Sequence, residues 1–108
     1  MTYEPKITSE HWNDENGNPA GGITQGRGFT ISWQNGPLGK GENRREPNGA
    51  FVEDVIVAVV DRLEYYQQSK FASDYNAVAI ASLKAALATL NSRTADREQR
   101  DVEGTHEA

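Results

Sequence analysis

The chain has 108 residues, which suits one domain and is too short for two ordinary ones. Its net charge of -5 argues against a nucleic-acid-binding protein, because DNA and RNA binding needs a net basic surface. The absence of cysteine excludes disulfides and thiolate zinc sites, and the spacing of His11 and His106 predicts no metal site. The polar segment Thr2–Glu10, and the lack of any apolar run of roughly 18 residues, predict a cytoplasmic protein with no signal peptide and no membrane span.

The N-terminal part predicts strands and turns. We expect a short strand within Ile7–Trp12, and then a loop through the turn cluster Asn13–Pro19 and the pair Gly21-Gly22. Arg27–Gln34 is the clearest strand, because aromatic and β-branched residues alternate there with polar ones. We expect three apolar residues of this strand to face the core, namely Phe29, Ile31 and Trp33.

A turn at Asn35-Gly36 leads into a charged loop, Lys40–Pro47. The loop contains Arg44-Arg45. This pair is either solvated or closes over an anionic ligand, and the sequence leaves both interpretations open.

A first helix is expected from about Ala50 to Gln68, with Asn48 as its N-cap. An apolar stripe at three-and-four spacing follows this segment, at Val52, Val55, Ile56, Val59, Leu63 and Tyr66. Val57 and Val60 add a second apolar flank. A helix with two apolar flanks usually has two partners, so we expect contacts both within the chain and with a second subunit.

A second helix is expected from about Asp74 to Asp101, with Ser73 as its N-cap. The spacing of its stripe alternates four and three, as in a coiled-coil seam: Asn76, Ile80, Leu83, Leu87, Leu90, Thr94 and Arg97. The two helices should form an antiparallel hairpin. The polar ends of the seam either find partners or fray into solvent.

A row of arginines ends this second helix. Arg93 and Arg97 are four residues apart and therefore share a helix face, which Arg100 continues. Fixed guanidinium groups suit phosphate, because each is always charged and offers a planar fork of donors. The alternative is a solvated helix end at which cations are favoured by the helix dipole.

An aromatic pair ends the first helix. In a hairpin, Tyr65-Tyr66 lies near the start of the second helix, and hence near Asn76. A ring beside an amide can hold a nucleobase, because the base stacks on the ring while the amide reads its edge. The same residues are also an ordinary way to end a core.

Together these patterns predict an α+β fold that is oligomeric. A small N-terminal antiparallel β layer in residues 1–47 precedes a long two-helix hairpin in residues 48–108, and we expect residues 1–108 to form a single domain. No histidine pair, metal-ligand set or activated nucleophile occurs at a plausible spacing, so we expect no catalytic residues, no cofactor and no enzymatic activity.

Three stretches resemble a known family. The C-terminal pattern resembles the signature of a phage helical-hairpin domain, which is shared by an anti-CBASS sponge and the first type of Thoeris anti-defence protein: Arg93-Thr94-x-x-Arg97-Glu98-x-Arg100-x-Val102-Glu103-Gly104-Thr105-His106. The upstream run Gly26–Leu38 resembles the strand-and-turn layer of the Thoeris branch only, and so does the segment Val52–Gln67. Asp101 departs from the pattern, since the family usually has Gly there, and its charge lies near the arginines.

The resemblance implies a sponge that binds a cyclic nucleotide immune signal and holds it without cleaving it. Glycocyclic ADP-ribose from Thoeris is the implied main ligand, and cyclic di- or trinucleotides from CBASS are a second class. It also implies dimers that assemble into hexamers. Tyr66 matches the position that stacks on adenine, where the family often has Phe, and Asn76 matches a polar position of the same pocket. Arg93 and Arg97 match the pair that contacts cyclic trinucleotide phosphates.

One rival hypothesis is a structural helical-hairpin protein that oligomerises and scaffolds a phage particle. It predicts assembly without ligand and indifference to Tyr66→Ala. A phosphodiesterase and a nucleic-acid-binding regulator are the other two alternatives, and they predict ligand cleavage and steep salt-dependent binding to nucleic acid, respectively.

Overall fold

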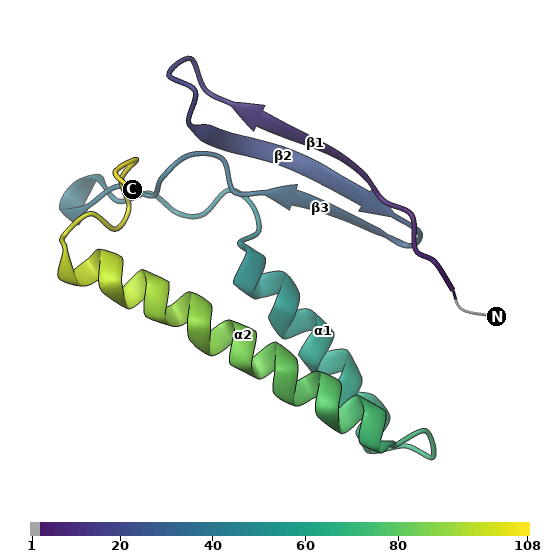
Figure 1. The fold of residues 1–108 in the computed structure, drawn as a ribbon. Coiled ribbons are helices and arrows are strands. Elements are labelled where there is room, and N and C mark those ends of the chain that lie inside the picture. Colours follow the sequence, from purple (N-terminus) through teal and green to yellow (C-terminus); the bar gives the residue numbers. More distant parts are fainter. Residues whose placement is uncertain (1–2) are drawn as a thin grey trace. The chain divides into compact units, whose positions relative to one another are not determined.

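The computed structural model describes residues 3–108, and Thr2, at the start of the polar N-terminal segment, lies outside them. The chain forms two compact units. The first unit runs to Phe51 and also includes Val102–Ala108, and the second unit is Val52–Asp101. The predicted α+β class is confirmed, since a three-stranded antiparallel sheet is followed by two helices that form a hairpin (Figure 1).

The sheet contains β1 (Thr8–Asn13), β2 (Pro19–Gly26) and β3 (Phe29–Trp33), in that spatial order. The prediction of a loop around Gly21-Gly22 was wrong, because these residues belong to the central strand. Glycine is required at position 22 because a side chain has no space there. A Cβ at Gly22 would collide with the carbonyl oxygen of Glu10 on β1. Gly22 therefore lets the backbone of β1 approach closely, which is a second use of glycine besides turns.

One face of the sheet is organised around a buried hydroxyl. Thr24 on β2 is 7% exposed, and its Oγ1 lies 3.0 Å from Ser9 Oγ. The indole Nε1 of Trp33 donates to the same oxygen at 2.8 Å. Trp33 and Ile31 are half-buried, but the expectation that Phe29 also faces a core was wrong, since its side chain is 45% exposed. Phe29 instead lies over Gly26, where an added Cβ would collide with the Phe29 ring.

The connection between β3 and the first helix is held by amide side chains. Asn48 Oδ1 accepts from the backbone N–H of Asn35 at 2.8 Å, and Asn48 Nδ2 donates to the carbonyl of Asn35 at 3.0 Å. The prediction of Asn48 as a helix N-cap was therefore wrong, because its side chain is engaged by a turn of its own unit. Ala50 forms a parallel bridge with Trp33, so the helix begins only at Val52.

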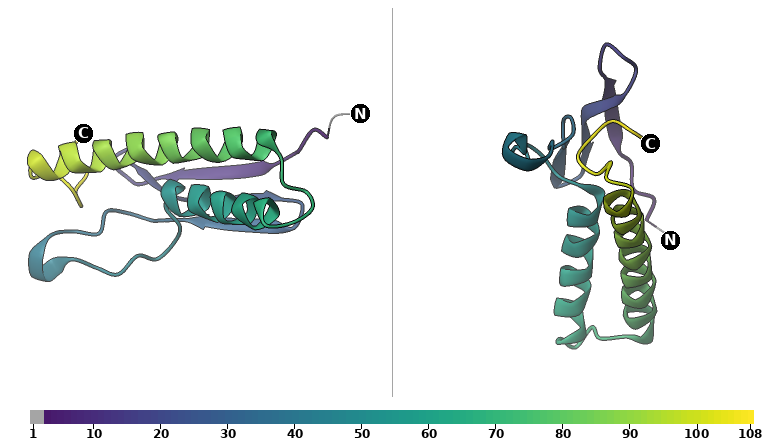
Figure 2. Two further views of the ribbon diagram at one scale, coloured as in Figure 1. Left: turned by 90° about the horizontal axis from the view of Figure 1, so that it is seen from below. Right: turned by 90° about the vertical axis from the view of Figure 1, so that its left-hand side faces the viewer.

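The second unit is a hairpin of α1 (Val52–Gln67) and α2 (Asp74–Gln99), which lie side by side (Figure 2). Ser73 caps α2 as predicted, since its Oγ accepts from the backbone N–H of Asn76 at 3.1 Å. The predicted seam of α2 is confirmed, because all seven of its residues are half-buried while most other positions of the helix are exposed: Asn76, Ile80, Leu83, Leu87, Leu90, Thr94 and Arg97. Neither helix combines the length and apolarity that a bilayer span requires.

The inward face of α1 differs from the predicted stripe. Val60, which was assigned to a flank, is buried at 8% exposure, whereas Val52 and Val59 are 51% and 44% exposed. The face that is at least half-buried at three-and-four spacing comprises Glu53, Ile56, Val60, Leu63 and Gln67. Valines around most of the helix circumference leave the phase of an apolar stripe undetermined, so spacing alone could not identify this face.

Candidate ligand-binding sites on the helical hairpin

The loop between α1 and α2 is built around one glutamine. Gln67 Oε1 accepts from the backbone N–H of Ser73 at 2.9 Å, and Gln67 Nε2 donates to the carbonyl of Ser73 at 3.0 Å. Next to Gln67, the carbonyl of Tyr66 accepts from Ser69 Oγ at 2.6 Å. These bonds fix the end of α1 against the start of α2. Tyr66 and Asn76 consequently lie at the same end of the hairpin, as the sequence predicted.

The Asn76 amide is already engaged by this loop. Its Nδ2 donates to Gln67 Oε1 at 3.0 Å and to the carbonyl of Phe71 at 3.2 Å. Both amide protons are therefore used, and among residues 3–108 the Oδ1 atom has no hydrogen-bond donor. Asn76 can offer a ligand an acceptor whose orientation is fixed by the two donated bonds.

An arginine that the sequence analysis missed lies beside the tyrosines. The Cζ atom of Arg62 is 4.9 Å from the ring centroid of Tyr65 and 5.0 Å from that of Tyr66. Its Nε donates to the Tyr66 hydroxyl at 3.4 Å, and this hydrogen bond is the main cause of a raised pKa for Arg62. The two rings are tilted by 57° with centroids 5.9 Å apart. The spacing of three and four residues could have identified this cluster, because such residues are neighbours on a helix surface.

The opposite end of the hairpin carries the arginine row. Arg93 Nη2 lies 3.4 Å from Glu53 Oε1 in the first turn of α1. Arg97 is half-buried one turn further along α2, and Arg100 pairs with Asp96 at 3.1 Å. Because α1 begins at Val52, the last turns of α2 extend beyond the end of its partner helix. Arg93 and Arg97 thus lie at one end of the hairpin, and Tyr66 and Asn76 lie at the other.

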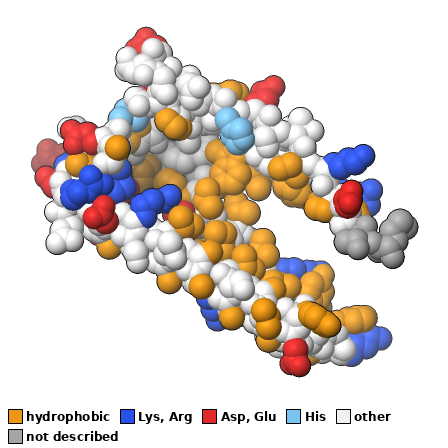
Figure 3. Space-filling model, in the orientation of Figure 1, with side chains coloured by type: hydrophobic (Ala, Val, Ile, Leu, Met, Phe, Trp, Pro, Cys, Tyr) orange, Lys and Arg blue, Asp and Glu red, His pale blue; other side chains and the backbone are white. Residues whose placement is uncertain are grey.

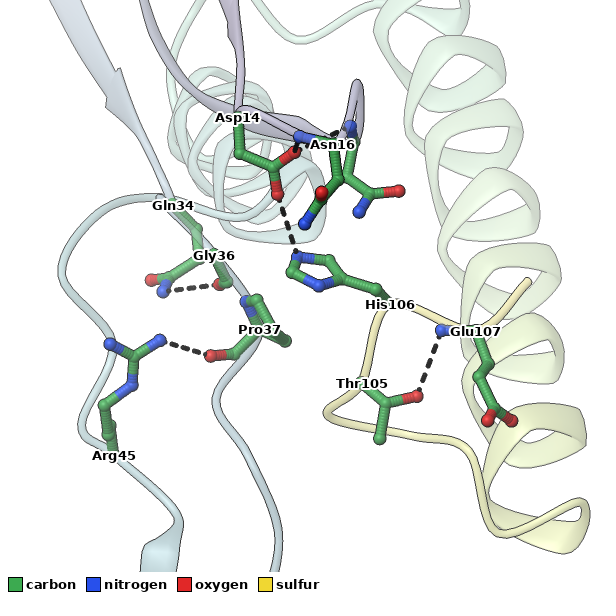
Figure 4. Close-up of polar contacts among 10 residues, drawn as sticks. Asp14, Asn16, Gln34, Gly36, Pro37, Arg45, Thr105, His106 and Glu107 are labelled. Carbon is green, nitrogen blue, oxygen red and sulfur yellow. Dashed lines mark hydrogen bonds and ion pairs between the residues drawn. The ribbon is translucent and has the colours of Figure 1, made fainter.

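Other charged groups are held within the first unit (Figure 4). Arg45 Nη2 donates to the carbonyl of Pro37 at 2.7 Å, and Arg44 Nη1 reaches the carbonyl of Gly39 at 3.5 Å. His106 Nε2 lies 3.7 Å from Asp14 Oδ2. Within residues 3–108, no three His, Asp or Glu side chains group in a way that could hold a metal ion.

Comparison with known proteins identifies the family to which the helical hairpin belongs. Residues 26–95 match the model of a family described as Acb2/Tad1, hairpin domain. The chain belongs to this family. It is also 48% identical over 82 residues to Thoeris anti-defense 1 of Bacillus phage SBSphiJ7, an alignment that covers 76% of this chain and 55% of that relative. The chain therefore spans about half the length of this relative.

The Acb2/Tad1 match confirms the family that the three sequence stretches indicated. It includes β3, α1 and α2 as far as residue 95, so Tyr66, Asn76 and Arg93 lie within it. Arg97 lies just past the C-terminal end of the matched residues. β1 and nearly all of β2 lie before their N-terminal end.

Proposed function

We propose that this protein is a phage anti-defence sponge that binds cyclic nucleotide immune signals and sequesters them without cleavage, in the cytoplasm of the infected bacterium. Glycocyclic ADP-ribose from Thoeris is the main ligand, and CBASS cyclic di- or trinucleotides form a second class. The similarity to Thoeris anti-defense 1 supports the anti-defence role. No catalytic residue, cofactor, DNA or RNA takes part, and the functional form is a homo-oligomer of dimers that assemble into a hexamer.

The observation that carries this proposal is the geometry at the hairpin tip. A half-buried Tyr66 ring lies next to the Arg62 guanidinium and at the same end as the Oδ1 acceptor of Asn76. An adenine nucleotide needs a stacking surface, an acceptor for its exocyclic amine and a positive charge near its phosphates. In this proposal Tyr66 stacks on the adenine and Asn76 reads its edge. Arg93 and Arg97 bind the phosphates of a cyclic trinucleotide where subunits converge.

Calorimetry with glycocyclic ADP-ribose isomers and cyclic di- and trinucleotides tests the proposal. We expect tight binding of at least one glycocyclic ADP-ribose, followed by recovery of intact ligand after heat denaturation. Tyr66→Ala should abolish that binding, whereas Tyr66→Phe keeps the stacking ring and should retain it. Arg97→Ala should remove only trinucleotide binding. Recovery of a cleaved product would instead establish an enzyme.

A scaffold protein is the alternative function. Large apolar side chains on both helices are exposed within one chain, and this favours assembly: Val52, Val57, Val59, Tyr65, Tyr75 and Val78. A scaffold would assemble without ligand, bind nothing on the panel and tolerate Tyr66→Ala. The calorimetric panel therefore separates the two functions.

A further inference from the structure

Glu53 on α1 is the carboxylate that pairs with Arg93, the first arginine of the row. Its Oε1 lies 3.4 Å from Arg93 Nη2, and its side chain is 27% exposed, whereas that of Arg93 is 58% exposed. Glu53 occupies the inward face of α1, three residues before Ile56 and seven before Val60. It also stands in the first turn of α1, where the helix dipole favours a negative charge. Its position is therefore set by the backbone of α1.

A second pair between the same two helices provides a comparison. Glu64 Oε1 lies 3.1 Å from Lys84 Nζ, and both side chains are more exposed than Glu53, at 46% and 60%. That pair lies nearer the middle of the hairpin, away from the arginine row. It can only link α1 to α2. The Glu53–Arg93 pair makes the same kind of link but occupies a guanidinium that a phosphate would need.

The ion pair of Arg93 with Glu53 conflicts with the proposed binding of ligand phosphate by Arg93. A phosphate that approaches Arg93 must share the guanidinium with Glu53 or displace it, and the Glu53 charge repels the phosphate in either case. Exposed ion pairs contribute about 0.2–1 kcal/mol, so competition of this size weakens anion binding by up to about fivefold per Arg93.

We propose that the Glu53 carboxylate competes with phosphate for Arg93 and so lowers the affinity of Arg93 and Arg97 for phosphate-bearing ligands. This inference rests on the proposed role of Arg93 and Arg97 in binding ligand phosphates. The opposite role for Glu53 is to orient Arg93 for the ligand. The two roles predict changes of opposite sign when the carboxylate is removed, because loss of a competitor strengthens binding and loss of an orienting group weakens it.

The test compares Glu53→Gln with Glu64→Gln, which removes the matched charge from the Lys84 pair. Calorimetry would use two probes, a cyclic trinucleotide and inorganic tripolyphosphate, which has no base. We expect E53Q to bind both probes more tightly, by about two- to fivefold for each Arg93 engaged, and E64Q to differ from wild type by less than about twofold. The double variant E53Q with Arg93→Gln should lose the gain, and circular dichroism would verify that each variant folds.

Unchanged or weaker binding of both probes in E53Q would overturn the inference, and so would a failure of every variant to bind tripolyphosphate. E53Q could bind tripolyphosphate more tightly than wild type does while neither wild type nor E53Q binds the trinucleotide. That result would support competition at Arg93 and contradict the proposed trinucleotide site. The failure of the inference and the failure of the proposed function are thus distinguished.

Discussion

Arg62 lies against both tyrosine rings at the end of α1, at 4.9 and 5.0 Å from their centroids. A cation over an aromatic face is attracted by the ring quadrupole, and the bond to the Tyr66 hydroxyl adds a directional restraint. The contact therefore holds the Tyr66 ring in one orientation before a ligand arrives. A preorganised ring loses less conformational freedom on binding.

We predict that Arg62→Gln weakens the binding of a base-stacking ligand by about two- to fivefold, which corresponds to an exposed cation–π contact. The free energy of unfolding should change by less than about 1 kcal/mol, because Arg62 is exposed. Calorimetry with wild type and R62Q measures the first quantity and urea unfolding the second. Lys84→Gln, which also removes an exposed cation from the hairpin, is the control and should leave affinity unchanged. Equal affinities for R62Q and wild type would exclude a role for Arg62 in positioning Tyr66.

Gly104 lies at a close backbone contact that leaves no space for a side chain. Its φ is 82°, and an added Cβ would collide with the carbonyl oxygen of Gly39. The two glycines are joined by a hydrogen bond from Gly39 N to Gly104 O at 2.9 Å. Gly28 has a similar φ of 79° but open space around it, so substitution there tests backbone strain alone.

We predict that Gly104→Ala detaches the C-terminal segment from the loop around Gly39, whereas Gly28→Ala costs only about 1–2 kcal/mol of backbone strain. Hydrogen exchange at the Gly39 amide measures this directly, because that N–H donates to Gly104. Exchange should accelerate in G104A and stay near the wild-type rate in G28A. Equal protection in the two variants would mean that the close contact does not hold the segment.

Residue-scale predictions succeeded where local chemistry decides the conformation. Ser73 caps α2 because a hydroxyl before a helix needs only the helix itself. Asp101, which the sequence analysis noted only as a departure from the family's usual Gly, adopts a left-handed φ of 58° after α2. Asn48 failed because a residue 13 positions away, Asn35, binds its amide, and a local pattern contains no information about such a partner.

At the scale of elements, the hairpin was predictable and the central strand was not. The seam of α2 repeats over the whole helix, so period and phase could both be read from it. β2 contains Gly21-Gly22 and has neither alternation nor β-branched enrichment across its length. It becomes a strand because β1 and β3 pair with it on both sides. This pairing is tertiary and overrides the weak strand propensity of its residues.

The turn between β1 and β2 contains a carboxylate that makes it sensitive to pH. The backbone N–H of Asn18 donates to Asp14 Oδ1 at 3.0 Å and is the main cause of a lowered pKa for Asp14. The N–H of Asn16, at 2.9 Å, and the charge of His106 lower it further (Figure 4). These donors stabilise the ionised carboxylate in the folded chain.

We predict that Asp14 stabilises the fold at neutral pH and that this contribution disappears in acid. Its pKa lies below 3.8 when folded and near 3.8 when unfolded, so the unfolded chain binds the proton more readily. The stabilisation is complete above the unfolded value and is lost as pH falls through the folded value. Urea unfolding from about pH 5 to pH 2 measures this, with Asp14→Asn as the comparison. Identical pH profiles for D14N and wild type would contradict the prediction.

At the scale of the whole molecule, the hairpin leaves apolar surface uncovered. Val60 is its buried apolar side chain, while Val78 on α2 is 67% exposed and Val59 on α1 is 44% exposed. Figure 3 displays apolar side chains along both helices. A domain of this size buries only about 60–65% of its unfolded surface, so a second copy would add burial that one chain lacks.

We predict that the purified protein is an oligomer. Light scattering coupled to size exclusion should give a molar mass that is a multiple, larger than one, of the 11.9 kDa of a single chain. Val59→Lys and Val78→Glu place charges on the apolar surface of the helices, and burying an unpaired charge between subunits is costly. Each variant should shift the mass toward the monomer, whereas Thr30→Glu on β3, which is exposed and polar already, should not. A wild-type protein that stays monomeric at high concentration would contradict the prediction.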